Sequence, residues 1–256
     1  MCYERLLRVF CIAFCAGALA LPARAEIAGQ VLIAVGDVSA TRAGKTIRFS
    51  PNAEIESGDR IHTGAASNLQ ILFTDSGLVS IHSGSDFVVD KYSYREQRSD
   101  PGTAFFRLLK GGGRFVTGLI GQRNRENYMV RVPTAVIGVR GTHFSLHLCR
   151  RECGNSDGKP AAEGLYGEVI EGRIAVTPAE NKALAREFGA GESFHLADAK
   201  SAPAPLTAPP PFLKDKLDKQ ARSAGKTGAA PGDRAQPGAG PNQRDPGPPF
   251  VPPSRR

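Results

Sequence analysis

Short stretches of alternating apolar and polar residues run through most of the chain between residues 26 and 200. Leu69, Ile71 and Phe73 alternate with polar positions, and a turn at residues 75–77 follows them. Further apolar stretches lie at residues 79–81, 87–89, 115–116, 128–132, 135–139, 144–148 and 169–176. Such short strands, separated by turns rich in Gly, Asp and Ser, are typical of an all-β fold, and helical periodicity is nearly absent. We therefore predict a single all-β domain of short antiparallel strands, arranged as a sandwich or as a short β-solenoid-like body.

The expected strand at residues 142–149 illustrates the two faces of this pattern. Side chains along a strand point alternately to opposite faces, so Phe144, Leu146 and Leu148 share one face. The residues between them, including two histidines, share the other face with Cys149. The apolar face is the one expected in the core.

Glycine occurs 22 times among residues 26–200 and marks the expected turns. Glu171 and Gly172 fit a hairpin turn that joins two strands, and residues 111–113 fit a bulge or a turn. Gly141 is expected where the backbone passes close to a neighbouring strand. These residues are predicted to specify the fold and to carry no chemistry.

The first 25 residues resemble an export signal. Arg5 and Arg8 precede an apolar or small-residue run of 13 residues at 9–21, and a small-x-small site ends at Ala25. A helix of 13 residues spans about 20 Å, less than the roughly 30 Å of a membrane core. We therefore predict a signal peptide at 1–25, cleaved after Ala25, and a mature chain without a transmembrane segment in the periplasm or cell envelope.

The composition changes again after residue 200. Residues 201–256 contain 13 of the 19 prolines, with nine basic and four acidic residues. Such a segment has too few large apolar residues to offset its conformational entropy. It is predicted to be a disordered, basic, Pro/Gly-rich tail. It either tethers the protein to anionic envelope polymers or is solvated without a partner.

The net charge of +8 comes mostly from this tail and not from the domain. Residues 26–200 hold 21 basic and 20 acidic residues, a balance that disfavours nucleic acid as a partner. One local excess of positive charge remains, because residues 114–140 contain five arginines and a single glutamate. These arginines are either scattered and solvated or a contact for an anionic ligand: Arg114, Arg123, Arg125, Arg131 and Arg140.

Three of the five cysteines lie in the predicted signal peptide, so the mature chain keeps Cys149 and Cys153. Two thiols in an oxidising compartment predict a disulfide. The alternative is a zinc site in which both cysteines bind together with His143 and His147. That site requires reduced thiols, which export disfavours. We predict the disulfide, with no metal and no cofactor.

Catalytic chemistry has little support in the sequence. The chain contains no His-Glu-x-x-His motif and no phosphate-binding loop. Four aspartates lie in or beside Gly/Ser turns, where carboxylates usually cap backbone amides. They are Asp37, Asp59, Asp75 and Asp86. We therefore predict that the protein is not an enzyme.

Four stretches, in the right order, resemble the FecR domain, a periplasmic module first described in iron-dicitrate signalling regulators. They are residues 57–64 with 69–77 (Ser57-Gly58-Asp59 to Asp75-Ser76-Gly77), residues 109–114, residues 132–144 (Val132-Pro133-Thr134-Ala135 to Gly141-Thr142-His143-Phe144), and residues 169–176. The resemblance covers roughly residues 30–196 and implies a secreted β-domain that works by contact with another macromolecule. It also implies a cytoplasmic anti-sigma segment and a transmembrane helix before the domain. Here the predicted signal peptide leads directly into the domain, so the regulatory role is not carried over.

The predicted function is that of a secreted, non-enzymatic FecR-type contact module for a protein or ligand in the bacterial envelope, with a possible role in signalling. Its partner is an envelope protein or an anionic glycan that the sequence does not identify. The alternative is a structural protein of the cell wall or its polysaccharides, held by the basic tail and the arginine-rich loop.

Overall fold

The structure is a computed structural model that describes residues 25–96, 100, 102–150, 153–154 and 158–213. Residues 1–24 of the predicted signal peptide (1–25) and residues 214–256 of the predicted tail (201–256) lie outside the described residues. The strands are β1 (Ile27–Val35), β2 (Val38–Arg42), β3 (Lys45–Arg48), β4 (Glu54–Glu56), β5 (Arg60–Thr63), β6 (Asn68–Phe73), β7 (Leu78–Ile81), β8 (Asp86–Ser93), β9 (Thr103–Val116), β10 (Tyr128–Val132), β11 (Ala135–Cys149), β12 (Gly164–Pro178), β13 (Arg186–Gly189), β14 (Ser193–Leu196) and β15 (Ala204–Leu206).

Helical structure in the described residues is short. It consists of α2 (Leu119–Arg123) and three 3₁₀ turns, η1 (Arg125–Asn127), η2 (Lys182–Leu184) and η3 (Pro211–Leu213). None of these helices is long and apolar enough to cross a membrane. The all-β prediction is confirmed.

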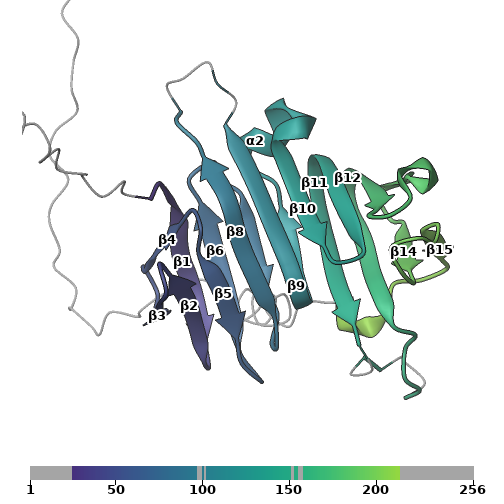
Figure 1. Ribbon diagram of the computed structural model, residues 1–256, viewed down its shortest axis with the longest axis horizontal. Coiled ribbons are helices and arrows are strands. Elements are labelled where there is room, and N and C mark those ends of the chain that lie inside the picture. The colour runs from purple at the N-terminus through teal and green to yellow at the C-terminus, as the bar shows by residue number, and fades with distance from the viewer. Residues whose placement is uncertain (1–24, 97–99, 101, 151–152, 155–157, 214–256) are drawn as a thin grey trace, which may run out of the picture. The chain divides into compact units, whose positions relative to one another are not determined.

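All the strands belong to one sheet (Figure 1). Its main path runs β15-β14-β12-β11-β10-β9-β7-β6-β1-β4, and β13, β8, β5, β2 and β3 branch from it. The strand pairs are antiparallel, as predicted, except that β10 pairs with β9 in parallel. A parallel neighbour is possible here because α2 and η1 carry the chain back from the end of β9 to the start of β10.

The long strands β9, β11 and β12 shape the sheet. Each pairs with one set of strands, or row, along one half of its length and with a second row along the other half. The first half of β9 pairs with β8 and β10, whereas its second half pairs with β7 and β11. A glycine with positive φ lies inside each long strand, at Gly111 of β9 (75°), Gly141 of β11 (52°) and Gly172 of β12 (76°). Glycine adopts such angles without the steric cost that a Cβ imposes. The glycines therefore mark the bends by which the strands pass from one row to the other.

The predicted hairpin turn at Glu171 and Gly172 is wrong. Strand β12 continues through both residues and pairs with β11 on either side of them. The register shifts between Arg140 and Phe144 of β11, which places a bulge opposite the bend. A glycine after a polar residue suits a bend as well as a turn, and here the partner strand continues past it.

Aromatic side chains from the two rows meet in one hydrophobic core. Phe73 of β6 lies 5.1 Å from Phe106 of β9, centroid to centroid, although these strands do not pair. Phe188 of β13 and Phe194 of β14 stack at 4.8 Å in the same way. The predicted apolar face of β11 contributes to this core, since Phe144, Leu146 and Leu148 are all buried in it.

The described fold extends to Leu213 and thus enters the segment predicted to be a disordered tail from residue 201. β15 pairs with β14 at the edge of the sheet, and Leu213 is buried. An edge strand tolerates proline because one side of its backbone needs no ladder hydrogen bond, which explains how Pro205 fits. Residues 203–213 are called the C-terminal strap below.

Candidate functional site

The five arginines predicted as an anion contact do not converge. Arg114 lies on β9, where its Nε donates to His143 Nε2. Arg131 lies on β10, with its Nε 3.4 Å from the sulfur of Met129. Arg123 ends α2. The structure brings only two of the five, Arg125 and Arg140, towards a common partner.

That partner is Arg173 of β12, which the sequence analysis did not single out. Arg173 faces Arg140 directly across the β11–β12 ladder, so both side chains leave the same face of the sheet. Glu187 of β13 lies 3.6 Å from Arg173 and 3.4 Å from Arg125. Arg125 and Arg173 thus share one carboxylate, and Arg140 lies opposite Arg173 in the ladder. We call Arg125, Arg140, Arg173 and Glu187 the arginine patch. Finding Arg173 required the strand register.

His143 belongs to a different environment, on the outer face of β11, the face opposite the main core. Burial lowers the pKa of His143, and the nearby Arg114 guanidinium lowers it further, while Glu171 on β12 opposes them. A neutral imidazole can accept the hydrogen bond that Arg114 donates. His143 is therefore bonded to an arginine and lies outside the cluster formed by His147 and the cysteines.

The turn carboxylates have structural roles. Asp59, with no exposed surface, accepts hydrogen bonds from Arg42 and from the backbone N–H of Glu56. Asp75, also buried, accepts from the backbone N–H groups of Gly77 and Ile120. Both therefore satisfy backbone amides, as predicted for these residues.

The remaining two aspartates form ion pairs instead. Asp86 is held by Arg60, and this hydrogen bond lowers the pKa of the Asp86 carboxyl. Asp37 lies 3.5 Å from Arg48 at the surface. The prediction of backbone capping was wrong for these two, because an arginine on a neighbouring strand reaches each carboxylate. None of the four contacts another in a way that suggests acid–base catalysis.

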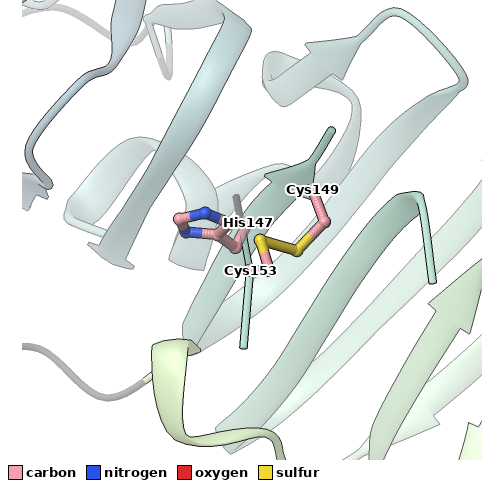
Figure 2. Close-up of side chains that lie close together, drawn as sticks. All are labelled: His147, Cys149 and Cys153. Carbon is pink, nitrogen blue, oxygen red and sulfur yellow. A yellow bond between two sulfur atoms is a disulfide. The ribbon is translucent and has the colours of Figure 1, made fainter. Parts of the chain in front are cut away.

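Cys149 and Cys153 form a disulfide in the structure, with an S–S distance of 2.07 Å (Figure 2). This supports the predicted pairing. The His147 ring lies beside the disulfide, and a ring nitrogen and the two sulfurs lie within 4.8 Å of one another. Sulfurs that are bonded to each other are not thiolates, and zinc requires thiolates. The zinc alternative also required His143 as a ligand, but His143 accepts a hydrogen bond from Arg114 instead.

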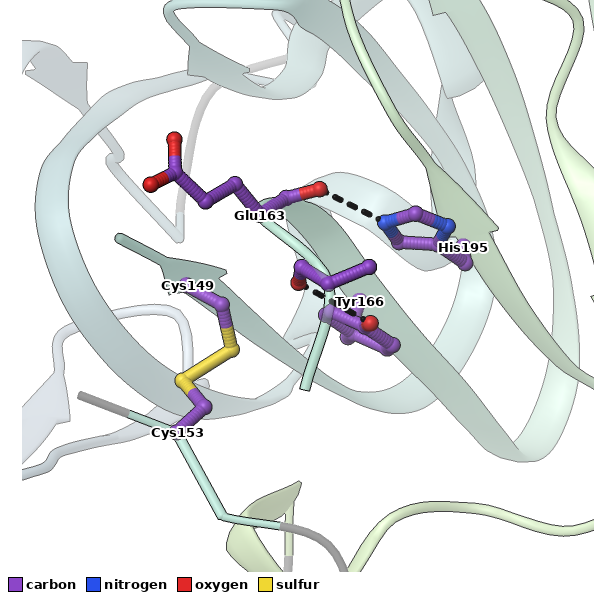
Figure 3. Close-up of a disulfide and its surroundings, with 6 residues drawn as sticks. Cys149, Cys153, Glu163, Tyr166 and His195 are labelled. Carbon is purple, nitrogen blue, oxygen red and sulfur yellow. Dashed lines mark hydrogen bonds between the residues drawn. A yellow bond between two sulfur atoms is a disulfide. The ribbon is translucent and has the colours of Figure 1, made fainter. Parts of the chain in front are cut away.

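Next to the disulfide, aromatic and imidazole rings form a row on the outer face (Figure 3). The rings of Tyr166 on β12 and His195 on β14 stack at 4.4 Å. The Tyr166 hydroxyl donates to the carbonyl of Ala162 at 3.0 Å, and His195 Nε2 donates to the carbonyl of Glu163 at 2.9 Å. Burial raises the pKa of the Tyr166 hydroxyl. These bonds hold both rings in position.

A third surface feature lies on β1, at the other end of the sheet path. Ile27, Leu32, Ile33 and Val35 are exposed, and they are four of the five large hydrophobic side chains that are exposed among the described residues. The register against β6 shifts between Val31 and Ile33, so the bulge places Leu32 and Ile33 outward together. Sequence alternation alone did not reveal this cluster, because the bulge breaks the alternation. We call Leu32, Ile33 and Val35 the β1 patch.

Comparison of the chain with known protein families finds one match. Residues 59–174 match the family described as FecR protein. None of the curated proteins matches the chain. The match begins at the buried Asp59 and ends at Ile174, a core residue of β12, so it includes the bends at Gly111, Gly141 and Gly172.

Two crystal structures of a "putative anti-sigma factor" from Parabacteroides distasonis ATCC 8503, at 1.65 and 2.50 Å resolution, are similar to part of the chain. Sequence identity is 14% in both cases, with TM-scores of 0.40 and 0.42. The similar region covers 59% of this chain and 60% of the other protein. The sequence resemblance and the family match agree: residues 59–174 of this chain are similar to the FecR family.

Proposed function

We propose that this chain is an exported, non-enzymatic contact module of the bacterial envelope that binds another protein through the β1 patch. The predicted signal peptide supports the export, and the FecR match supports a role in contact or regulation. The observation that carries the proposal is the exposure of Leu32, Ile33 and Val35 together on one strand.

The position of the β1 patch suits a protein partner. From Ile33 to Val35, the described strands pair with β1 through β6 alone, whereas β4 covers only Ile27 to Gln30. Apolar side chains beside an open strand edge favour contact with another polypeptide, since a partner can cover the side chains and pair with the backbone.

Site-specific crosslinking in the producing bacterium tests this proposal. A photoreactive amino acid at Val35 is expected to give one adduct of defined mass, and the Ile33→Asp variant should lose it. The same amino acid at Thr46, an exposed residue of β3, is the control and should give no adduct. Equal labelling at both positions, or none at Val35, would contradict the proposal. Mass spectrometry of the chain from the periplasmic fraction should show Glu26 as the first residue.

The arginine patch favours a second candidate function, attachment to an anionic glycan of the envelope. Arg125, Arg140 and Arg173 carry three positive charges against the single carboxylate of Glu187. Heparin is a suitable probe, because its sulfates match guanidinium groups. Binding should fall steeply between 50 and 500 mM salt and should be lost in Arg140→Glu/Arg173→Glu. Binding that survives this change but is lost on deletion of residues 214–256 would place the anion contact in that segment instead.

A further inference from the structure

The C-terminal strap lies over the row of rings on the outer face of the sheet. Tyr166 faces His147 across the β11–β12 ladder and His195 across the β12–β14 ladder, so the three rings lie side by side. On the far side of His147 the ladder continues to Gly112 of β9, where a Cβ would lie 2.3 Å from His147 Nδ1. The absence of a side chain at Gly112 leaves room for the imidazole to lie flat.

The strap binds this face in two ways. Ala204 to Leu206 add a short strand, β15, to the edge of β14, opposite Ser193 to His195. Farther along, the Phe212 ring lies 5.3 Å from His147 and 5.1 Å from Tyr166, edge-on to the tyrosine at 87°. Strand addition at a sheet edge, and proline-rich segments on aromatic side chains, are two common ways in which proteins bind extended peptides.

The strap ends in a small apolar cluster that includes the disulfide. Leu213 is 1% exposed and packs in a small cluster with Cys149, Cys153, Ala161 and Tyr166. The disulfide holds the residues after β11 against this cluster. The Cys149–Cys153 bond is therefore part of the apolar surroundings of the last residue of the strap.

The strap is not part of the main core. Its cluster is separate from the main core cluster, which contains no residue beyond Leu196. Its strand pairing is three residues long, and Pro205 in the middle has no N–H to donate. Within the strap only Pro203 and Leu213 are fully buried. The strap can therefore leave without exposing the main core to water.

We propose that the outer face of β11, β12 and β14 is a binding groove for an extended, uncharged, proline-containing peptide segment of a partner protein. The strap is the intramolecular competitor of that segment, and its own sequence indicates the chemistry that fits: a small-residue strand, a proline run, and an aromatic residue followed by leucine. This groove is distinct from the β1 patch, so the two proposals succeed or fail separately.

The test uses the full chain with the strap weakened at its anchor. The double variant Phe212→Ser/Leu213→Asp should bind a fluorescein-labelled peptide of residues 202–213 at least ten-fold more tightly than the wild-type chain, in which the strap competes. The matched control is Thr207→Asp, which places the same charge on an exposed strap residue and should bind like the wild type. In the double variant, Tyr166→Ala and Cys149→Ser/Cys153→Ser should each lower the affinity at least ten-fold.

Several outcomes would overturn the proposal. One is a folded double variant that binds the peptide no better than the wild-type chain. Another is equal binding of a peptide whose final Phe-Leu is replaced by Ser-Asp. A wild-type chain that dimerises by exchanging straps at micromolar concentration would show that the groove serves a second copy and not a foreign partner.

Hydrogen exchange of the wild-type chain tests the proposal even if the variants fail to fold. The Leu213 amide, which donates to the Pro210 carbonyl, should exchange at least 100-fold faster than the amides of Ile137 and Val176 in the β11–β12 ladder. Exchange of Leu213 at the rate of those core amides would show that the strap opens only with the whole fold, which contradicts its role as a competitor.

Discussion

Arg42 of β2 holds the buried carboxylate of Asp59 in a bidentate pair, with Nε and Nη2 each 2.7 Å from one carboxylate oxygen. The same guanidinium reaches Glu56 at 2.7 Å and the Glu54 carbonyl at 2.8 Å. One side chain thus joins β2 to β4 and to the turn that precedes β5. The side-chain hydrogen bond to Asp59 is the main cause that raises the pKa of Arg42.

Replacing Asp59 should destabilise the fold strongly. Asp59→Ala leaves the Arg42 charge without its buried partner and the Glu56 amide without its acceptor, so we expect a loss of about 3 kcal/mol. The control is Asp90→Ala, which removes a more exposed aspartate paired with Arg107 and should cost less than about 1 kcal/mol. Urea unfolding of both variants measures the difference. Equal losses would show that the Asp59 pair is no more than a surface interaction.

The bend of β12 gives a second prediction. Gly172 has a φ of 76°, and a Cβ there would lie 2.3 Å from the Gly141 carbonyl oxygen. Gly172→Ala should therefore cost about 3 kcal/mol, from the strained angle together with the clash. Gly191→Ala is the matched control, because its φ is 82° but a Cβ there meets nothing within 4 Å.

The control variant separates the two causes. Gly191→Ala should cost only about 1–2 kcal/mol, the penalty of the left-handed conformation alone. Thermal unfolding of both variants gives the comparison. If both lose the same stability, the close approach of β11 and β12 at the bend contributes nothing.

Features of this fold could be predicted from the sequence where a few neighbouring residues determine them. The alternation of Phe144, Leu146 and Leu148 shows a buried strand face without any partner, and the structure buries all three. The pair Glu171-Gly172 is compatible with a turn or a bend, and only the length of the neighbouring strand distinguishes them. That information lies in residues 30 positions away.

The same reason explains what the site prediction missed. Arg173 joins the arginine patch through its register with Arg140, which no sequence spacing shows. The strap has the composition of a disordered segment, yet Phe212 and Leu213 find a face built by three strands and a disulfide. The amino-acid composition of the strap carries no information about the face of the sheet that the strap contacts.

His143 predicts how stability changes with pH. Its pKa is lowered in the folded protein, first by burial and then by Arg114, from an ordinary value of 6.5. Below pH 6.5 the unfolded chain therefore binds a proton that the folded chain resists, and stability falls as the pH decreases through this range. Urea unfolding at pH 7.5 and pH 5.0 should show this loss, and His143→Gln should reduce it. His62→Gln, at an exposed residue of β5, is the control and should retain the wild-type loss.

Reduction of the Cys149–Cys153 disulfide should affect the strap more than the main core. The bond closes a ring of five residues, so the chain-entropy estimate limits its effect on the free energy of unfolding to about 2 kcal/mol. Leu213 belongs to the same buried cluster as both cysteines, whereas the main core cluster contains neither of them. With a thiol reductant present, exchange of the Leu213 amide should accelerate at least ten-fold while the Val176 amide changes little. Equal acceleration at both amides would show that the disulfide supports the whole fold, and that the cluster around Leu213 is not a separate unit.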